Sequence, residues 1–137
     1  MTIKTKKDYV ERLKKLKKNV YIGGEKVGHV DERLIPGITV VGVTFDMANN
    51  PEFEDVCTAQ SHITGEKINR FCHIHQSKED LLKKQEMTRL LCQRCGGCIQ
   101  RCMGIDSMNA LSTSTKLIDM KYKTNYYERF INYLKHF

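Results

Sequence analysis

Residues 91–104 read LCQRCGGCIQRCMG, which places Cys92, Cys95, Cys98 and Cys102 in a C-x2-C-x2-C-x3-C run. Helix-forming sequence flanks this stretch, whereas the Gly-Gly pair inside it favours the end of a helix. In one continuous helix the four thiols would spread over ~15 Å, too far for one cluster. We therefore expect a helix to end at the glycines, with Cys98 and Cys102 close together at i and i+4.

So many cysteines in a short stretch predict metal binding, because thiolate sulfur is a soft donor that suits iron. The run has the spacing of bacterial ferredoxins, so one hypothesis is a small four-cysteine iron–sulfur protein for electron transfer or scaffolding. However, Met103 stands where such a run normally has proline, and only Cys57 and Cys72 remain for a second cluster. Zinc is disfavoured because its structural sites place two close pairs around a longer loop. The non-functional alternative is that the cysteines are small buried hydrophobic residues.

The composition is that of one globular domain. The chain has 137 residues, of which 40% are apolar and 28% charged. No apolar run reaches the ~18 residues that span a bilayer, and the first residues lack the apolar core of a secretory signal. We therefore expect a cytoplasmic protein without a membrane partner, whose cysteines are thiols or metal ligands.

The net charge of +7 is concentrated near the N-terminus, where basic residues crowd positions 4–18. A surface of this kind can bind nucleic acid or phosphate. Tyr9, Leu13 and Leu16 recur at helical spacing, which instead favours a solvated helix face opposite a buried stripe. Because no aromatic residues interleave with a basic strand, we expect no nucleic-acid partner.

The sequence predicts a mainly α fold with small β-hairpins. Ser77 and Asp80 have the spacing of a capping box, and a Gly-Gly turn predicts a hairpin over Val20–Val27. Residues 61–75 read as a turn followed by an extended stretch. Leu81, Leu82, Met87, Leu90 and Leu91 form the expected apolar face of the helix that follows Ser77. The predicted helices cover residues 5–18, the segment from Pro36, 51–59, the segment from Ser77 to the cysteines, 103–115 and 126–134.

Residues 89–111, RLLCQRCGGCIQRCMGIDSMNAL, resemble the 4-hydroxybutyryl-CoA dehydratases, which are also vinylacetyl-CoA Δ-isomerases. These enzymes belong to the 4-hydroxyphenylacetate 3-monooxygenase flavoprotein family. Residues 64–82 and 123–130 are similar too, so the resemblance covers essentially the whole chain. It implies that residues 1–137 are a single partial domain, the N-terminal part of the family's first, helical domain, which resembles acyl-CoA dehydrogenases.

The resemblance also implies a site. Such enzymes hold a [4Fe–4S] cluster through three cysteines and one histidine, and Cys98 and Cys102 match two of these cysteines. Their position between the cysteines makes Gln100 the candidate for a contact to sulfide or substrate and Arg101 a weaker one; the alternative is that both are polar residues on a helix surface. Cys92 and Cys95 are not part of the motif. None of the histidines matches the family's ligand: His29, His62, His73, His75 and His136.

Full-length relatives are expected to use FAD and the cluster in a radical dehydration of 4-hydroxybutyryl-CoA to crotonyl-CoA. The other cluster ligands, the main flavin-binding segments and the catalytic residues of the family would lie beyond this sequence. The chain is therefore expected to be inactive alone. Its expected partners are a CoA thioester substrate and further copies of the protein, or a downstream segment that completes the site.

Overall fold

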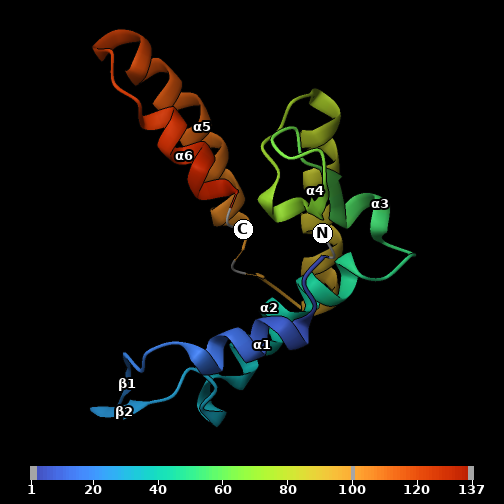
Figure 1. Cartoon of the computed structure of the whole chain (residues 1–137). Coiled ribbons are helices and arrows are strands. Elements are labelled where there is room, and N and C mark those ends of the chain that lie inside the picture. Colours follow the sequence, from blue (N-terminus) through green and yellow to red (C-terminus); the bar gives the residue numbers. More distant parts are fainter. Residues whose placement is uncertain (1–2, 100, 136–137) are drawn as a thin grey trace.

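The computed structural model describes residues 3–99 and 101–135, and it is mainly helical. Two small antiparallel hairpins interrupt the helices (Figure 1). The elements are, in chain order, α1 (Lys6–Lys15), β1 (Val20–Ile22), β2 (Glu25–Val27), η1 (Glu32–Leu34), α2 (Ile35–Ala48), α3 (Glu54–Cys57), β3 (Thr58–Gln60), β4 (Lys67–Asn69), η2 (Arg70–Cys72), α4 (Lys78–Cys95), α5 (Cys102–Tyr122) and α6 (Tyr126–Leu134).

The N-terminal helix and the first hairpin follow the prediction. Thr5 caps α1 in a capping box with Asp8, and β1 pairs with β2 across a turn in which Gly23 and Gly24 have positive φ. α1 packs on α2, where the Tyr9 ring stacks on Phe45 at 5.2 Å. The predicted buried stripe is wrong at Leu16, which lies past the end of α1 and is 46% exposed.

The second hairpin, β3–β4, was not predicted. Thr58 pairs with Asn69 and Gln60 with Lys67, and Gly65 at φ 71° forms the turn between them. The stretch Thr-Ala-Gln is short and polar, so it lacks the apolar alternation by which strands are recognised. Residues 58–60 therefore form a strand where the sequence predicted the end of a helix.

α4 begins and ends where its sequence predicts. Ser77 and Asp80 form the expected capping box, and Gly96 ends the helix in the left-handed conformation at φ 70°. The predicted apolar face of α4 is confirmed at some positions and wrong at others. Met87 and Leu91 are fully buried, but Leu81 and Leu82 are 50% and 55% exposed.

The main core lies where α2, α3, η2, α4 and the start of α5 meet. Its fully buried members include Met87, Leu91, Ile99 and Ile105. Ile99 belongs to the connection between α4 and α5, so this connection is part of the core as well as a link between helices.

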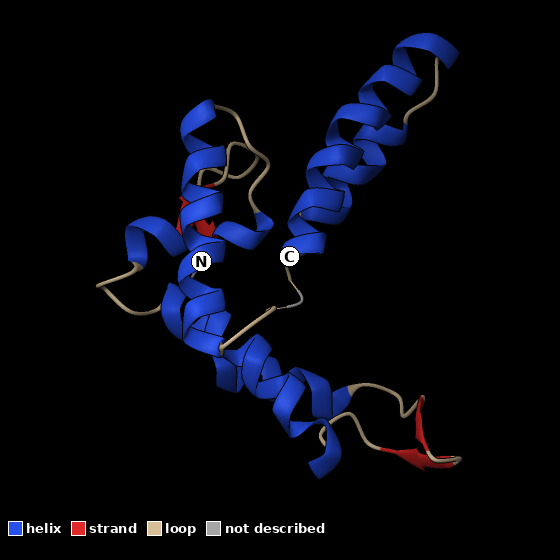
Figure 2. Cartoon of the chain, turned by 180° about the vertical axis from the view of Figure 1, so that it is seen from behind, coloured by secondary structure: helices blue, strands red, loops and turns tan. Residues whose placement is uncertain are grey.

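α5 and α6 form an antiparallel pair that extends away from α4 (Figures 1 and 2). α5 runs beyond the predicted end to Tyr122, where Lys123 turns the chain at φ 55°. The Asp119 carboxylate accepts hydrogen bonds from the backbone N–H groups of Tyr126 and Tyr127, and so satisfies two donors at the start of α6. α6 has the predicted bounds, and Phe130 and Leu134 pack with Ile74 in a second small core. None of the described helices is both long and apolar enough to cross a bilayer.

Replacing Ser77 by alanine should lower the free energy of unfolding by about 1 kcal/mol, because the N–H of Asp80 loses its hydroxyl acceptor. Urea denaturation followed by circular dichroism measures the change. Ser107→Ala, at an exposed position inside α5, is the matched control and should cost nothing. Equal stability of Ser77→Ala and wild type would show that the cap contributes nothing.

Candidate functional site

The connection between α4 and α5 carries the two cysteines predicted as cluster ligands. Cys98 is exposed within the connection, and Cys102 is the partly buried first residue of α5. Since Cys98 lies before the helix, one helical turn does not relate the pair, although their i, i+4 spacing suggested it. Gln100, the third predicted site residue, lies outside the described residues.

Cys92 and Cys95 lie on the last turns of α4, before the helix end at Gly96. Burial and the neighbouring Cys92 raise the pKa of the Cys95 thiol, whose Sγ lies 4.0 Å from the Val40 carbonyl oxygen. Among the residues that the structure describes, no three His, Cys, Asp or Glu side chains are grouped to hold a metal. The α4–α5 connection therefore offers a cluster two thiols of the type that iron prefers, and the other ligands would have to come from elsewhere.

Arg101, between the two cysteines, points to the inside of the molecule. Its guanidinium carbon lies 4.8 Å from the centre of the Phe45 ring and 4.6 Å from that of Phe71. Arg101 Nη1 donates a hydrogen bond of 2.6 Å to Oγ1 of the buried Thr44. The prediction that Arg101 contacts sulfide or substrate therefore has a competing interpretation, because its charged group is already engaged by α2 and η2.

Of the two remaining cysteines, Cys57 is buried and Cys72 is partly buried. Burial raises the pKa of Cys57, which is 1% exposed, to about 11. Burial also raises the pKa of Cys72, and the nearby charge of Arg101 only partly opposes this rise. Neither thiol is a ready thiolate ligand at neutral pH.

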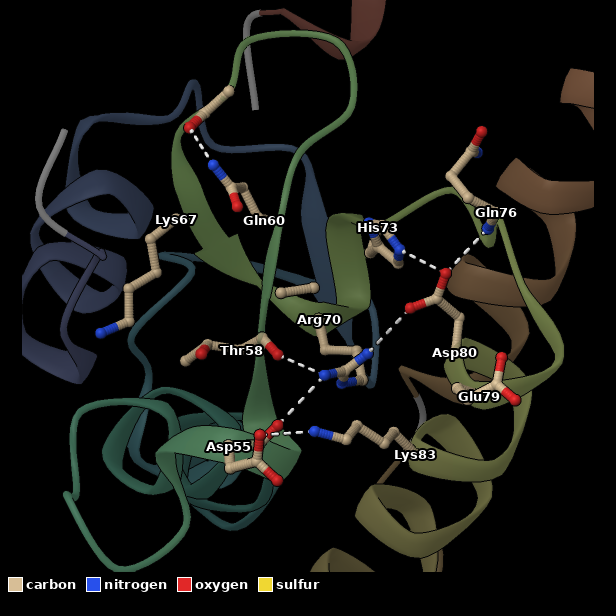
Figure 3. Close-up of a pocket in the computed structure, with 12 residues that line it drawn as sticks. Asp55, Thr58, Gln60, Lys67, Arg70, His73, Gln76, Glu79, Asp80 and Lys83 are labelled. Carbon is tan, nitrogen blue, oxygen red and sulfur yellow. Dashed lines mark hydrogen bonds and ion pairs between the residues drawn. The ribbon is translucent and has the colours of Figure 1, made fainter.

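A polar pocket of about 730 Å³ lies on another face, between the β3–β4 hairpin and the start of α4 (Figure 3). At its base is Arg70, which is 3% exposed. Arg70 Nε donates to the Val56 carbonyl at 2.6 Å, and Nη2 donates to the carbonyls of Asp55 and Thr58 at 3.1 and 2.5 Å. Arg70 thus satisfies backbone acceptors at the end of α3, which the short helix itself leaves free.

Asp80 connects this buried arginine to the start of α4. Its Oδ1 lies 3.6 Å from Arg70 Nη1, and its Oδ2 lies 3.1 Å from Nε2 of the buried His73. Within the described part of the chain, neither ring nitrogen of His73 has a well-aligned hydrogen bond, so the His73–Asp80 contact is close but poorly directed. Burial raises the pKa of Asp80, but hydrogen bonds from the Gln76 and Ser77 N–H groups and the close contact with His73 outweigh it and hold that pKa below its usual value.

Ion pairs engage the lysines at the rim of this pocket. Lys83 pairs with Asp55, and Lys67 pairs with Glu54. The pocket is therefore a mostly neutralised polar network, which joins α3, the second hairpin and α4. No local pattern predicts this network beyond the cap role of Asp80, because its contacts join residues far apart along the chain.

Residues 5–137 match the model of the family described as 4-hydroxyphenylacetate 3-hydroxylase N terminal. The chain belongs to this family. It is 45% identical over 134 residues to the 4-hydroxybutyryl-CoA dehydratase/vinylacetyl-CoA-Δ-isomerase of Clostridium aminobutyricum, an alignment that covers 96% of this chain and 27% of the relative.

The solved structure of an oxygen-tolerant archaeal 4-hydroxybutyryl-CoA dehydratase from N. maritimus superposes on 98% of this chain with a TM-score of 0.91 and 43% sequence identity. The predicted family and the predicted helical fold class are thereby confirmed. The matched region is 27% of that solved chain, so this chain spans about a quarter of the length of either relative. The prediction of a single partial domain and the predicted ligands stay predictions.

The exposure of the thiols predicts an order of alkylation by iodoacetamide at pH 8. Cys98 should react first because it is exposed, and Cys57 should react at least about a hundredfold more slowly because its raised pKa leaves little thiolate. Mass spectrometry of digests taken over time measures both rates. The chain unfolded in urea is the control, in which the two rates should converge. Equal rates in the folded protein would contradict the burial of Cys57.

Asp80→Asn should lower the free energy of unfolding at pH 7 by about 1–2 kcal/mol, because Arg70 and His73 lose a charged partner. The folded-state pKa of Asp80 is depressed, so its contribution is complete above the unfolded value of about 3.9 and is lost as pH falls through the folded value. Urea denaturation between pH 7 and pH 3 should show the stabilities of wild type and variant converging at acid pH. Asp46→Asn, at an exposed position of α2, is the control. A constant difference across this range would contradict the assignment.

Proposed function

We propose that the chain forms the cluster-binding N-terminal portion of a FAD- and [4Fe–4S]-dependent 4-hydroxybutyryl-CoA dehydratase/vinylacetyl-CoA isomerase. Cys98 and Cys102 are its contribution to the cluster. The observation that carries this proposal is the presence of two thiols, one exposed and one partly buried, at the α4–α5 junction of a chain that superposes on a solved dehydratase with a TM-score of 0.91.

The donor chemistry of the junction fits this role. Thiolates suit iron, and the described residues supply two of them without a complete ligand set. When bound, the cluster would supply a Lewis acid for the departing hydroxyl group, and FAD would supply electron-transfer chemistry. The chain itself has to present both thiols on the same side of the connection, and Gln100 is proposed to contact the cluster or the substrate beside them.

The remaining ligands and the flavin site are proposed to come from the part of the relatives that this chain does not span. The chain alone is then inactive. Its partners are a CoA thioester and either further copies of the same protein or a segment that completes the site. We also propose a cytoplasmic location, since a reducing compartment keeps such cysteines available as ligands.

The second candidate function is a small iron–sulfur protein for electron transfer or scaffolding that binds one cluster through all four cysteines of the run. Their C-x2-C-x2-C-x3-C spacing favours it. The structure favours the first candidate, because Cys92 and Cys95 lie on helix α4 and the left-handed turn at Gly96 separates them from Cys98.

An exchange of segments tests the proposed function. This chain replaces the matched quarter of the archaeal dehydratase, and the hybrid is purified without oxygen. It should contain iron and acid-labile sulfide and convert 4-hydroxybutyryl-CoA to crotonyl-CoA. Cys98→Ser or Cys102→Ser should lower the activity and the iron content at least about 100-fold, since a ligand is lost.

Cys92→Ser/Cys95→Ser in the same hybrid is the matched control and should leave the iron content and the activity unchanged. Loss of the cluster in this double variant would favour the four-cysteine function. A soluble hybrid that holds its cluster but loses it in no cysteine variant would overturn the assignment of the ligands.

A further inference from the structure

Two side chains attach the α4–α5 connection to the body of the protein. Ile99 is fully buried in the main core, next after the exposed Cys98. Arg101 is inserted between two aromatic rings, immediately before Cys102. Each predicted cluster ligand therefore has as its chain neighbour a residue whose side chain points inward.

The aromatic rings around Arg101 come from elements far away in the sequence. Phe45 belongs to α2 and Phe71 to η2, and Phe71 is 2% exposed. Phe45 also stacks on Tyr9 of α1, so contacts link the Tyr9 ring, the Phe45 ring, the Arg101 guanidinium and the Phe71 ring. Contacts of a guanidinium with ring faces suit arginine, whose delocalised and weakly hydrated group packs well on aromatic side chains.

The hydrogen bond to Thr44 fixes Arg101 further. Thr44 Oγ1 accepts from Arg101 Nη1 and donates to the Val41 carbonyl at 2.6 Å, so its own orientation is set by α2. None of the ion pairs among residues 3–99 and 101–135 includes Arg101. Among the described residues, it is therefore two rings and a hydroxyl group, and not a carboxylate, that contact this charge.

We infer that Arg101 is a positioning residue, which holds the predicted ligands ready to bind a metal by anchoring the chain next to Cys102 onto Phe45, Phe71 and Thr44. The inference rests on the proposed function of the two cysteines. It differs from a direct contact to the cluster, because the guanidinium acts through the backbone that it anchors. Consecutive Cα atoms are 3.8 Å apart, so fixing Arg101 fixes the adjacent Cys102 closely.

Cadmium binding tests this inference without the cluster or any enzymatic activity. The full chain carries Cys92→Ser/Cys95→Ser as a background, and Cd²⁺ is titrated without oxygen while the thiolate-to-cadmium absorption is recorded. Adding Cys98→Ser/Cys102→Ser to this background measures the absorption that comes from Cd²⁺ bound elsewhere than at this pair.

Arg101→Ala should weaken Cd²⁺ binding by the pair about tenfold, because ordering a free connection then opposes binding. Arg94→Ala is the matched control, since it removes the same charge from an exposed position of α4, and it should bind as the background does. Arg101→Lys keeps the charge but loses the planar guanidinium, and it should rescue binding only in part. Phe45→Leu keeps the apolar packing but loses one ring, and should weaken binding less than Arg101→Ala.

Thermal unfolding by circular dichroism separates positioning from overall stability. A folded Arg101→Ala variant that binds Cd²⁺ as tightly as the background would overturn the inference, whatever its melting temperature. If Arg101→Ala does not fold, the Cd²⁺ affinities of Arg101→Lys and Phe45→Leu test the inference instead. Unchanged binding in both variants would overturn the inference. A background chain that does not bind Cd²⁺ through Cys98 and Cys102 would also overturn it, whereas the proposed function would stand or fall with the hybrid enzyme.

Discussion

The left-handed turn at Gly96 is the constraint on which the arrangement of this chain depends. At φ 70° a side chain would strain the backbone, so glycine allows α4 to stop after Cys95. The N–H of Gly97 then bonds back to the Cys92 carbonyl at 3.0 Å. Because the helix stops here, Ile99 can enter the core, and Cys98 is separated from the cysteines of α4. A continuous helix would have spread all four thiols along its length.

Two arginines, the buried Arg70 and the partly buried Arg101, hold together the elements on either side of this turn by different means. Arg70 bonds through Nε and Nη2 to three backbone carbonyls, and Asp80 lies near its Nη1, so its charge is compensated although Nη1 itself makes no hydrogen bond to the described residues. Arg101 lies between two rings and bonds to a hydroxyl group. The first arrangement stabilises the polar pocket between α3 and α4. The second holds the connection that carries the candidate ligands.

The sequence predicted best those features that depend on neighbouring residues. The capping box of Ser77, the hairpin over Val20–Val27 and the helix over 126–134 were correct, because the interacting groups lie within a few residues of each other. It failed for the β3–β4 hairpin, whose short polar strand Thr58–Gln60 is defined only by its distant partner. It also failed for Leu81 and Leu82, where helical periodicity predicted burial but the described residues leave both side chains half exposed.

The features of the candidate site also divide into those that neighbouring residues determine and those that depend on distant contacts. The sequence by itself determined which cysteines resemble cluster ligands and where α4 must end, since both are properties of residues 91–104. Only the tertiary structure decided that Arg101 points inward and that Arg70, His73 and Asp80 share a pocket. The bond from Arg101 to Thr44 joins residues 57 positions apart. No local pattern encodes such a contact, because it forms only when the packing of α2, η2 and α4 brings both side chains to the same place.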